Sequence, residues 1–120
     1  MLIVEDNKVN LLITKKLLSS LYKNALIYEA YDGKMGVEIY SKEQPNIILM
    51  DIQMPVLNGL EATKIIRRQY NATIPILALS AGSAAENREK SISVGISEYL
   101  EKPINLKKLR ETIYKYLTNL

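Results

Sequence analysis

The sequence predicts an α/β protein in which five βα units form a doubly wound parallel sheet with helices on both faces. Short apolar runs alternate with longer amphipathic segments along all 120 residues, and this order favours a parallel sheet. The most apolar run, residues 47–50, is typical of a central strand buried on both faces. No linker or internal repeat interrupts the pattern, so we expect one domain spanning residues 1–120.

The strands are expected at the apolar runs. In chain order these runs are residues 2–4, 26–28, 47–50, 76–79 and 98–100. The turn signal Asp32–Gly33 follows the second run, and Pro75 leads into the fourth.

The helices are expected between the strands and after the last one. Their ranges are about residues 8–22, 33–42, 58 onward, 84–94 and 105 onward. Apolar residues share one face of the first helix (Val9, Ile13, Leu17, Leu21) and of the last (Leu106, Leu109, Ile113, Leu117). The third helix directs Ala62, Ile65 and Ile66 inward.

Several helix starts carry capping residues. Asn58 and Asn105 are expected to cap the third and fifth helices, and Ser83 with Glu86 fits a capping box for the fourth. The fourth helix has little apolar surface, so it should pack weakly and move easily.

The composition excludes whole classes of chemistry. The chain has no cysteine, hence no disulfide framework and no thiolate metal site. It has no histidine either, which removes every imidazole base and the Ser-His-Asp triad. Carboxylates, lysines, hydroxyls and amides remain.

The charge and hydropathy argue against nucleic-acid and membrane partners. A net charge of +3 is too small to imply nucleic acid, and the basic residues of the last helix are most simply a solvated face. No leader peptide is apparent and no apolar run approaches a membrane span, so we expect a cytoplasmic domain without membrane contact.

Polar residues gather where the predicted strands end. Glu5 and Asp6 follow the first strand, Asp51 the third, Ser80 the fourth and Lys102 the fifth. In a doubly wound sheet the functional cleft lies beyond the carboxyl ends of the strands, so these side chains are expected at one edge.

The charges at this edge predict a metal-assisted phosphoryl site. Lys102 offsets only one of three carboxylates, and a hard divalent cation such as Mg²⁺ would neutralise the rest. A carboxylate beside such a cation can act as nucleophile and form an aspartyl-phosphate. Lys102 would hold a phosphoryl oxygen, and Ser80 could donate a hydrogen bond to another.

Taken singly, these residues have plainer explanations. Glu5 and Asp6 could merely cap the first helix, while Ser80 and Lys102 could be ordinary surface groups. Asp51 closes the most apolar strand, where a carboxylate must be paired or exposed for a purpose. The coincidence of all of them at one edge favours the phosphate site.

Four segments together resemble a known family. They read LIVEDN over 2–7, ILMDIQMP over 48–55 with Asn58–Gly59 beyond it, ALSA over 78–81 and YLEKP over 99–103. Over essentially its full length the chain resembles the receiver domain of two-component response regulators, and the third segment looks most like receivers of hybrid sensor histidine kinases. The resemblance implies the flavodoxin-like form of the predicted fold.

The resemblance also implies a role for each acidic residue. Asp51 would be the phospho-acceptor, and Asp6 and Asp51 would bind Mg²⁺ directly. Glu5 would act mostly through a bound water, and the backbone carbonyl of Gln53 would complete the protein ligands. The chain has glutamate where many members have a second aspartate, a change that affects rates more than function.

The remaining matched residues would form the switch. Lys102 would grip the phosphoryl group, with a cis peptide before Pro103. Ser80, where threonine is common, would swing toward the phosphate, and Tyr99 would rotate inward behind it. Tyr99 is equally well explained as a half-buried core tyrosine.

The resemblance implies a signalling switch in a phosphorelay, with no enzymatic activity beyond its own phosphorylation and dephosphorylation. Because the chain lacks histidine, the phosphoryl donor would be a phosphohistidine on a partner kinase or histidine phosphotransfer protein. The output would be a protein contact through the fourth helix, fifth strand and fifth helix. The chain would be a free-standing receiver or part of a larger hybrid kinase.

Three other functions remain open. A receiver-like binding module that is never phosphorylated would tend to lose an acidic residue or the lysine, and this chain keeps both. A magnesium phosphatase that passes through aspartyl-phosphate usually wants a second acid two residues after the nucleophile, where this chain has Gln53. A flavin-binding protein of the same topology would need a phosphate-cradling first loop, which is missing.

Overall fold

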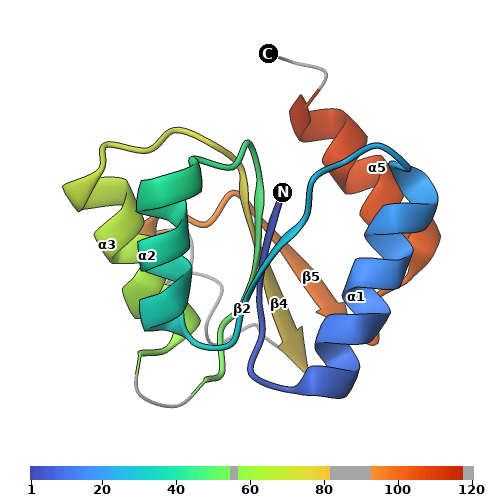
Figure 1. Ribbon diagram of the computed structural model, residues 1–120, viewed down its shortest axis with the longest axis horizontal. Helices are drawn as coiled ribbons and strands as arrows, with labels where there is room; N and C mark the ends of the chain where they lie inside the picture. The colour runs from blue at the N-terminus through green and yellow to red at the C-terminus, as the bar shows by residue number, and fades with distance from the viewer. Residues whose placement is uncertain (55–56, 82–92, 118–120) are drawn as a thin grey trace.

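Five parallel strands form a single sheet in the order β2-β1-β3-β4-β5 (Figure 1). The strands are β1 (Leu2–Val4), β2 (Tyr28–Ala30), β3 (Ile48–Asp51), β4 (Ile76–Ala81) and β5 (Glu98–Lys102). The structure is a computed structural model that describes residues 1–54, 57–81 and 93–117. The strand order is that of the flavodoxin-like fold, so the predicted fold class is confirmed.

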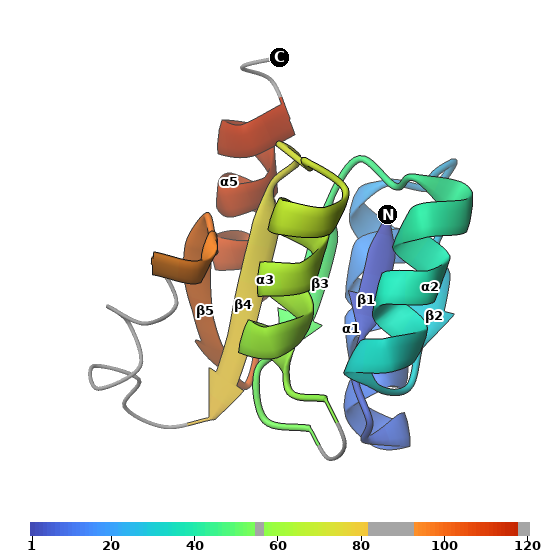
Figure 2. The ribbon, with the colours of Figure 1, turned by 90° about the vertical axis from the view of Figure 1, so that its left-hand side faces the viewer.

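Helices cover both faces of the sheet. They are α1 (Lys8–Leu21), α2 (Gly33–Glu43), α3 (Gly59–Gln69) and α5 (Leu106–Leu117). Figures 1 and 2 show α1 and α5 on one face and α2 and α3 on the other. The helix expected over residues 84–94, with its capping box, falls mostly outside the described residues. Ser93 and Val94 are helical.

Side-chain alternation along the buried strands gives the sheet two apolar layers. Leu2, Val4, Ile48 and Met50 pack in the layer that contains Ala62 and Ile66 of α3. Ile3 and Leu49 pack in the layer that contains Leu11 of α1 and Leu109 of α5. Burial on both faces explains why the central runs are continuously apolar, as predicted for residues 47–50.

The predicted inward face of α1 is half wrong. Leu17 and Leu21 pack against the apolar layer on that side of the sheet, but Val9 and Ile13 are 65% and 49% exposed. The buried residues of the helix are Leu11, Thr14 and Leu18. Because α1 is apolar on more than one side and its inner row includes a threonine, periodicity alone mixes the two rows. An apolar strip is therefore left on the outside of the helix.

The second strand lies two residues later than predicted. Tyr28 pairs with Leu2 and Ala30 with Val4, whereas Leu26 is 67% exposed. Pairing with β1 sets the register here, and the local apolar run does not reveal it. Leu106 is likewise 41% exposed instead of sharing the buried face of α5.

β4 and β5 extend further than predicted, because they pair with each other up to Ala81 and Lys102. Ser80 and Lys102 are consequently strand residues.

The caps expected at α3 and α5 are confirmed. Asn58 and Glu61 form a capping box at α3, and Asn105 Oδ1 accepts from the Lys108 amide at 3.0 Å.

The strands run in one direction, so the sheet has an amino edge and a carboxyl edge. Met1 and the end of α5 both lie toward the amino edge, while α1 begins at the carboxyl edge (Figure 1). Within the described chain, every helix falls short of the length and hydropathy required of a transmembrane segment.

Candidate functional site

Three carboxylates meet at the carboxyl edge of the sheet. Glu5 and Asp6 follow β1 directly, and Asp51 is the last residue of the adjacent strand β3. One carboxylate oxygen from each residue lies within 4.8 Å of the others. The structure therefore brings together the acidic residues that the sequence placed at strand ends.

Lys102 joins this cluster from the end of β5. Its Nζ lies 2.7 Å from Glu5 Oε1, to which it donates a hydrogen bond, and 3.4 Å from Asp51 Oδ1. Glu5 and Asp51 are only 1% and 4% exposed, whereas Asp6 is exposed to solvent. Among the described residues, a single ammonium thus faces the two buried carboxylates and leaves one of their negative charges uncompensated.

The pKa values of Glu5 and Lys102 are both shifted in this cluster. Burial, followed by the nearby Asp51 carboxylate, raises the pKa of Glu5 above its ordinary value. For Lys102 burial acts to lower the pKa, but the hydrogen bond to Glu5 and the charges of Asp51 and Glu5 together raise it. Burial thus dominates the shift at Glu5, and the neighbouring carboxylate adds to it, while at Lys102 the two carboxylates outweigh burial.

The loop after β3 holds Asp51 in place. The amide of Gln53 donates to Asp51 Oδ1 at 3.2 Å, and the Ile52 amide donates to Leu79 O of β4 at 3.2 Å. A Cβ on Gly59 would lie 2.2 Å from Asp51 O, so only glycine allows the start of α3 to approach the strand this closely. The sequence showed Gly59 but did not reveal this contact, which depends on packing.

Ser80 and Tyr99 lie on the neighbouring strands. Asp51 pairs with Leu79, so Ser80 is one residue further along β4, and it is 2% exposed. Tyr99 pairs with Ala78 and packs against the apolar layer of α2 and α3. Its hydroxyl is buried without a hydrogen-bond partner among the described residues, which is uncommon in a folded protein.

The donor set fits a hard divalent cation. Three carboxylates from two adjacent strand ends supply only oxygen ligands, and the exposed position of Asp6 leaves the cluster open to solvent on one side. Mg²⁺ prefers such sites, because it takes few protein ligands and retains several waters. The cis peptide expected between Lys102 and Pro103 is confirmed.

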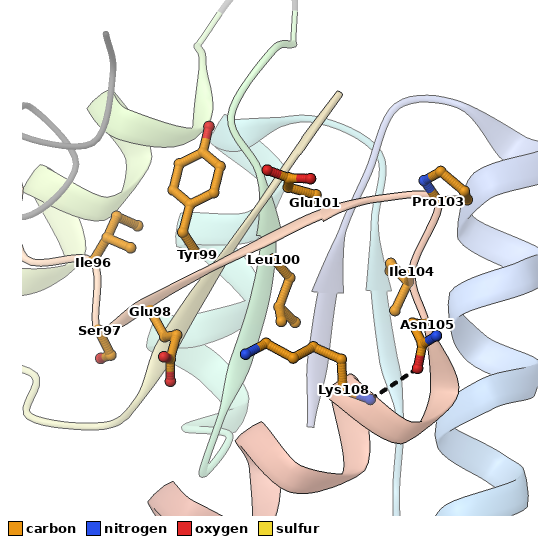
Figure 3. A pocket seen from close by; sticks show the side chains of 10 residues that line it. All are labelled: Ile96, Ser97, Glu98, Tyr99, Leu100, Glu101, Pro103, Ile104, Asn105 and Lys108. Atoms are coloured by element: carbon orange, nitrogen blue, oxygen red, sulfur yellow. Dashed lines mark hydrogen bonds between the residues drawn. The ribbon is translucent and has the colours of Figure 1, made fainter. Parts of the chain in front are cut away.

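Two hollows lie away from the carboxylates. A cavity of about 570 Å³ follows β5 and the start of α5, with Tyr99, Leu100 and Lys108 among its lining residues (Figure 3). A shallower groove of about 600 Å³ lies between α1 and β2 and is lined in part by Leu12, Lys15 and Tyr31. The segment at 99–103 that the sequence singled out lines part of the cavity, whereas the sequence did not predict the groove.

Known proteins resemble the chain in sequence. The family described as "Response regulator receiver domain" matches residues 1–114. The hybrid signal transduction histidine kinase G of Dictyostelium discoideum is 39% identical over 117 residues, which cover 96% of this chain and 3% of that protein. The chain spans between 3% and 15% of the length of the histidine kinases that it matches.

Solved structures resemble it in three dimensions. The receiver domain of sensor histidine kinase PA1611 from Pseudomonas aeruginosa, with a magnesium ion coordinated in its active site cleft, is 34% identical with a TM-score of 0.87. That match covers 98% of this chain and 95% of the other. The Saccharomyces cerevisiae complex of the histidine phosphotransfer protein Ypd1 with the receiver domain of Ssk1 gives 32% identity, a TM-score of 0.85, and coverage of 96% and 86%.

Proposed function

We propose, since this chain belongs to the response regulator receiver domain family, that Asp51 is its phospho-acceptor and that residues 1–120 form one such domain. Receiver domains are phospho-accepting switches of signalling proteins rather than metabolic enzymes, and this chain is such a switch. The observation that carries the assignment of Asp51 is its place between two acidic neighbours and Lys102 at the carboxyl edge of the sheet.

Phosphorylation would proceed by in-line attack on a phosphohistidine. A carboxylate oxygen of Asp51 forms a bond to phosphorus while the phosphorus–nitrogen bond to the donor imidazole breaks. Lys102, now 3.4 Å from Asp51 Oδ1, would hold a phosphoryl oxygen, and the Ser80 hydroxyl would donate to another. Positioning and charge neutralisation would account for most of the rate.

The acidic cluster would hold Mg²⁺. Asp6 and Asp51 would be direct ligands together with the backbone carbonyl of Gln53, and Glu5 would act through a water. The ion would neutralise charge on the phosphoryl oxygens and on the crowded carboxylates. The geometry supports this role, because Lys102 is the cation that contacts both buried carboxylates among the described residues and it can balance only one of them.

The phosphoryl donor would be a histidine kinase or a histidine phosphotransfer protein that docks beside α1. Val9, Leu12 and Ile13 are 65%, 53% and 49% exposed and form the outer apolar strip of this helix. The helix starts two residues after Asp6, so the strip begins next to the carboxylates. Contiguous exposed apolar side chains are typical of protein interfaces.

Phosphorylation would change a contact with a downstream protein on the other side of the site. The described part of that surface is formed by β5 and α5, where Tyr99 lines the cavity and its buried hydroxyl has no hydrogen-bond partner in the described part of the chain. Ser80 would move toward the phosphate and Tyr99 would turn inward behind it. We expect the domain to work in the cytoplasm, within or beside a hybrid histidine kinase.

The test is formation of an adduct with a small phosphodonor. Wild-type protein, Asp51→Asn and Asp32→Asn are incubated with Mg²⁺ and acetyl phosphate, and the intact mass is measured. Asp32 is the matched control because it is the one aspartate outside the cluster, and its role as cap of α2 is one that asparagine also fills. We expect one added phosphoryl group in the wild type and in Asp32→Asn, and none in Asp51→Asn.

Two results would contradict the proposal. An adduct that survives Asp51→Asn would place the acceptor elsewhere. A wild type that gains no mass, and that also fails to bind beryllofluoride, would favour a receiver-like module that is not phosphorylated.

A further inference from the structure

Ser97, the residue before β5, connects several elements at the amino edge of the sheet. Its amide donates to Ile76 O at 2.9 Å, and its Oγ accepts from the Ile76 amide at 3.1 Å. The same Oγ accepts from an Arg67 nitrogen at 3.3 Å, and its carbonyl accepts from the Tyr116 hydroxyl at 2.8 Å. The amino end of β5 is thus tied to β4, α3 and α5.

Arg67, in the last turn of α3, donates hydrogen bonds to two further residues besides Ser97. Its Nε donates to Gly95 O at 2.9 Å, and a second nitrogen donates to Ala72 O at 3.1 Å. A Cβ on Gly95 would lie 2.6 Å from Arg67 Cγ, and Gly95 has a φ of +110°, so this position requires glycine on two counts. We call Arg67, Gly95 and Ser97 the amino-edge anchor.

The last turn of α5 is bonded to the amino end of β5 as well. Besides the bond from Tyr116 to Ser97, Lys115 Nζ lies 3.5 Å from Glu98 Oε2 in an ion pair. The start of α5 is instead connected through Pro103 to Lys102, whose Nζ contacts the acidic cluster. The last turn of α5 is therefore bonded to the amino end of β5, whereas its first turn is linked through the chain to the carboxyl end.

We propose that Arg67 is a positioning residue that fixes the amino end of β5, so that a change at Lys102 tilts α5 instead of displacing the whole strand. This inference rests on the proposed function, because the change at Lys102 is its transfer to a phosphoryl oxygen. β5 spans about 16 Å from end to end, so the anchor acts at a distance from the reacting atoms and leaves phosphorylation itself intact.

The experiment compares Arg67→Met and Arg67→Lys with the wild type and with Arg68→Met. Arg68 is the matched control, because it is the next residue of α3 and is exposed. Methionine keeps a long stem against Gly95 but removes all three donors. Lysine keeps the charge, but its single ammonium cannot reproduce the fork that bridges the three acceptors. Amide chemical shifts and hydrogen exchange are measured with and without Mg²⁺ and beryllofluoride.

In the wild type and in Arg68→Met, we expect beryllofluoride to shift the amides at the start of α5 and to leave those at 114–117 and Ser97 nearly unchanged. In Arg67→Met, the shifts spread to 114–117, and the Ser97 amide exchanges about tenfold faster. Arg67→Lys gives an intermediate response. Beryllofluoride affinity stays within about twofold in all variants, since none of these residues lies in the acidic cluster.

Different failures separate the two proposals. A wild type that binds no beryllofluoride overturns the proposed function and the coupling role with it. If Arg67→Met binds beryllofluoride and shows the same chemical-shift changes in α5 as the wild type, the role of the anchor is overturned and the proposed function stands. This holds even if that variant is less stable. Should Arg67→Met fail to fold, a wild-type response in Arg67→Lys overturns the anchor and an intermediate response supports it.

Discussion

Glu5 holds a carboxylate that is almost fully buried beside the second buried carboxylate of Asp51. Such a pair is costly in water-excluded surroundings, and a folded protein keeps it only where a partner or a function compensates. Lys102 gives partial compensation in the structure, and the proposed Mg²⁺ gives the rest. The most buried charge among the described residues would therefore depend most on the proposed cation.

This charge predicts a pH dependence of stability. The pKa of Glu5 is raised above its ordinary value of 4.5, so the folded state binds the proton more tightly than the unfolded state does. The stabilisation is complete below pH 4.5 and is lost as the pH rises through the raised pKa. Urea unfolding without metal should show the free energy of unfolding falling over this window, and Mg²⁺ should reduce the fall.

Glu5→Gln should flatten that slope, because the neutral amide keeps the shape and can still accept from Lys102. We expect a gain on the order of 1 kcal/mol in the metal-free free energy of unfolding at neutral pH, together with weaker Mg²⁺ binding. Glu111→Gln, at an exposed position of α5, is the control and should retain the slope. An unchanged slope in Glu5→Gln would show that another group titrates.

For the residues of the acidic cluster the sequence was informative, because the ends of strands can be predicted from the ends of apolar runs. Glu5, Asp6, Asp51 and Lys102 meet where their strand-end positions predicted. The tight approach of Gly59 to Asp51 O was not foreseen, since it depends on how α3 packs on the loop after β3. Close backbone approaches leave no pattern in a single sequence beyond the glycine itself.

Among the elements, α1 carries two rows of apolar residues. One row packs on the sheet, and a second row (Val9, Leu12, Ile13) stays outside. Both rows are apolar, so the hydrophobic pattern could not distinguish the core face from the proposed docking face. The register of β2 escaped prediction for a related reason, because its pairing with β1 and not its composition fixes which residues form the strand.

The outer strip of α1 can be tested with Leu12→Glu. Leu12 is 53% exposed, so the free energy of unfolding should change by no more than about 0.5 kcal/mol. Phosphotransfer from a phosphorylated histidine phosphotransfer protein should fall by about tenfold or more, because a charge replaces a leucine of the proposed docking strip. Phosphorylation by acetyl phosphate should be unchanged.

Leu26→Glu is the matched control for that variant, as a leucine 67% exposed in the loop between α1 and β2. It should transfer phosphate at the wild-type rate. Equal losses in both variants, or a loss with acetyl phosphate as well, would argue against docking beside α1.

For the whole molecule, the proposed Mg²⁺ site would couple metal binding to folding. The three carboxylates come from residues 5, 6 and 51, so the unfolded chain does not hold them together. A ligand that binds only the folded state stabilises it, by about 2.7 kcal/mol at a concentration of one hundred times Kd. Thermal unfolding should therefore move to higher temperature with increasing Mg²⁺.

Asp6→Asn and Asp51→Asn should each lose most of this stabilisation, and NaCl at matched ionic strength should not reproduce it in the wild type. Scanning calorimetry across a Mg²⁺ titration provides the measurement. If Mg²⁺ stabilised both variants as much as the wild type, binding would have to occur outside the cluster.

The direction of the strands also divides the molecule into two sides. Met1 and the last turn of α5 lie toward the amino edge, and the carboxylates lie at the carboxyl edge. A polypeptide that continued before Met1 or beyond α5 would start from the side opposite the acidic cluster. The same fold can therefore be inserted into chains of very different length, because the flanking segments would not cover the acidic cluster.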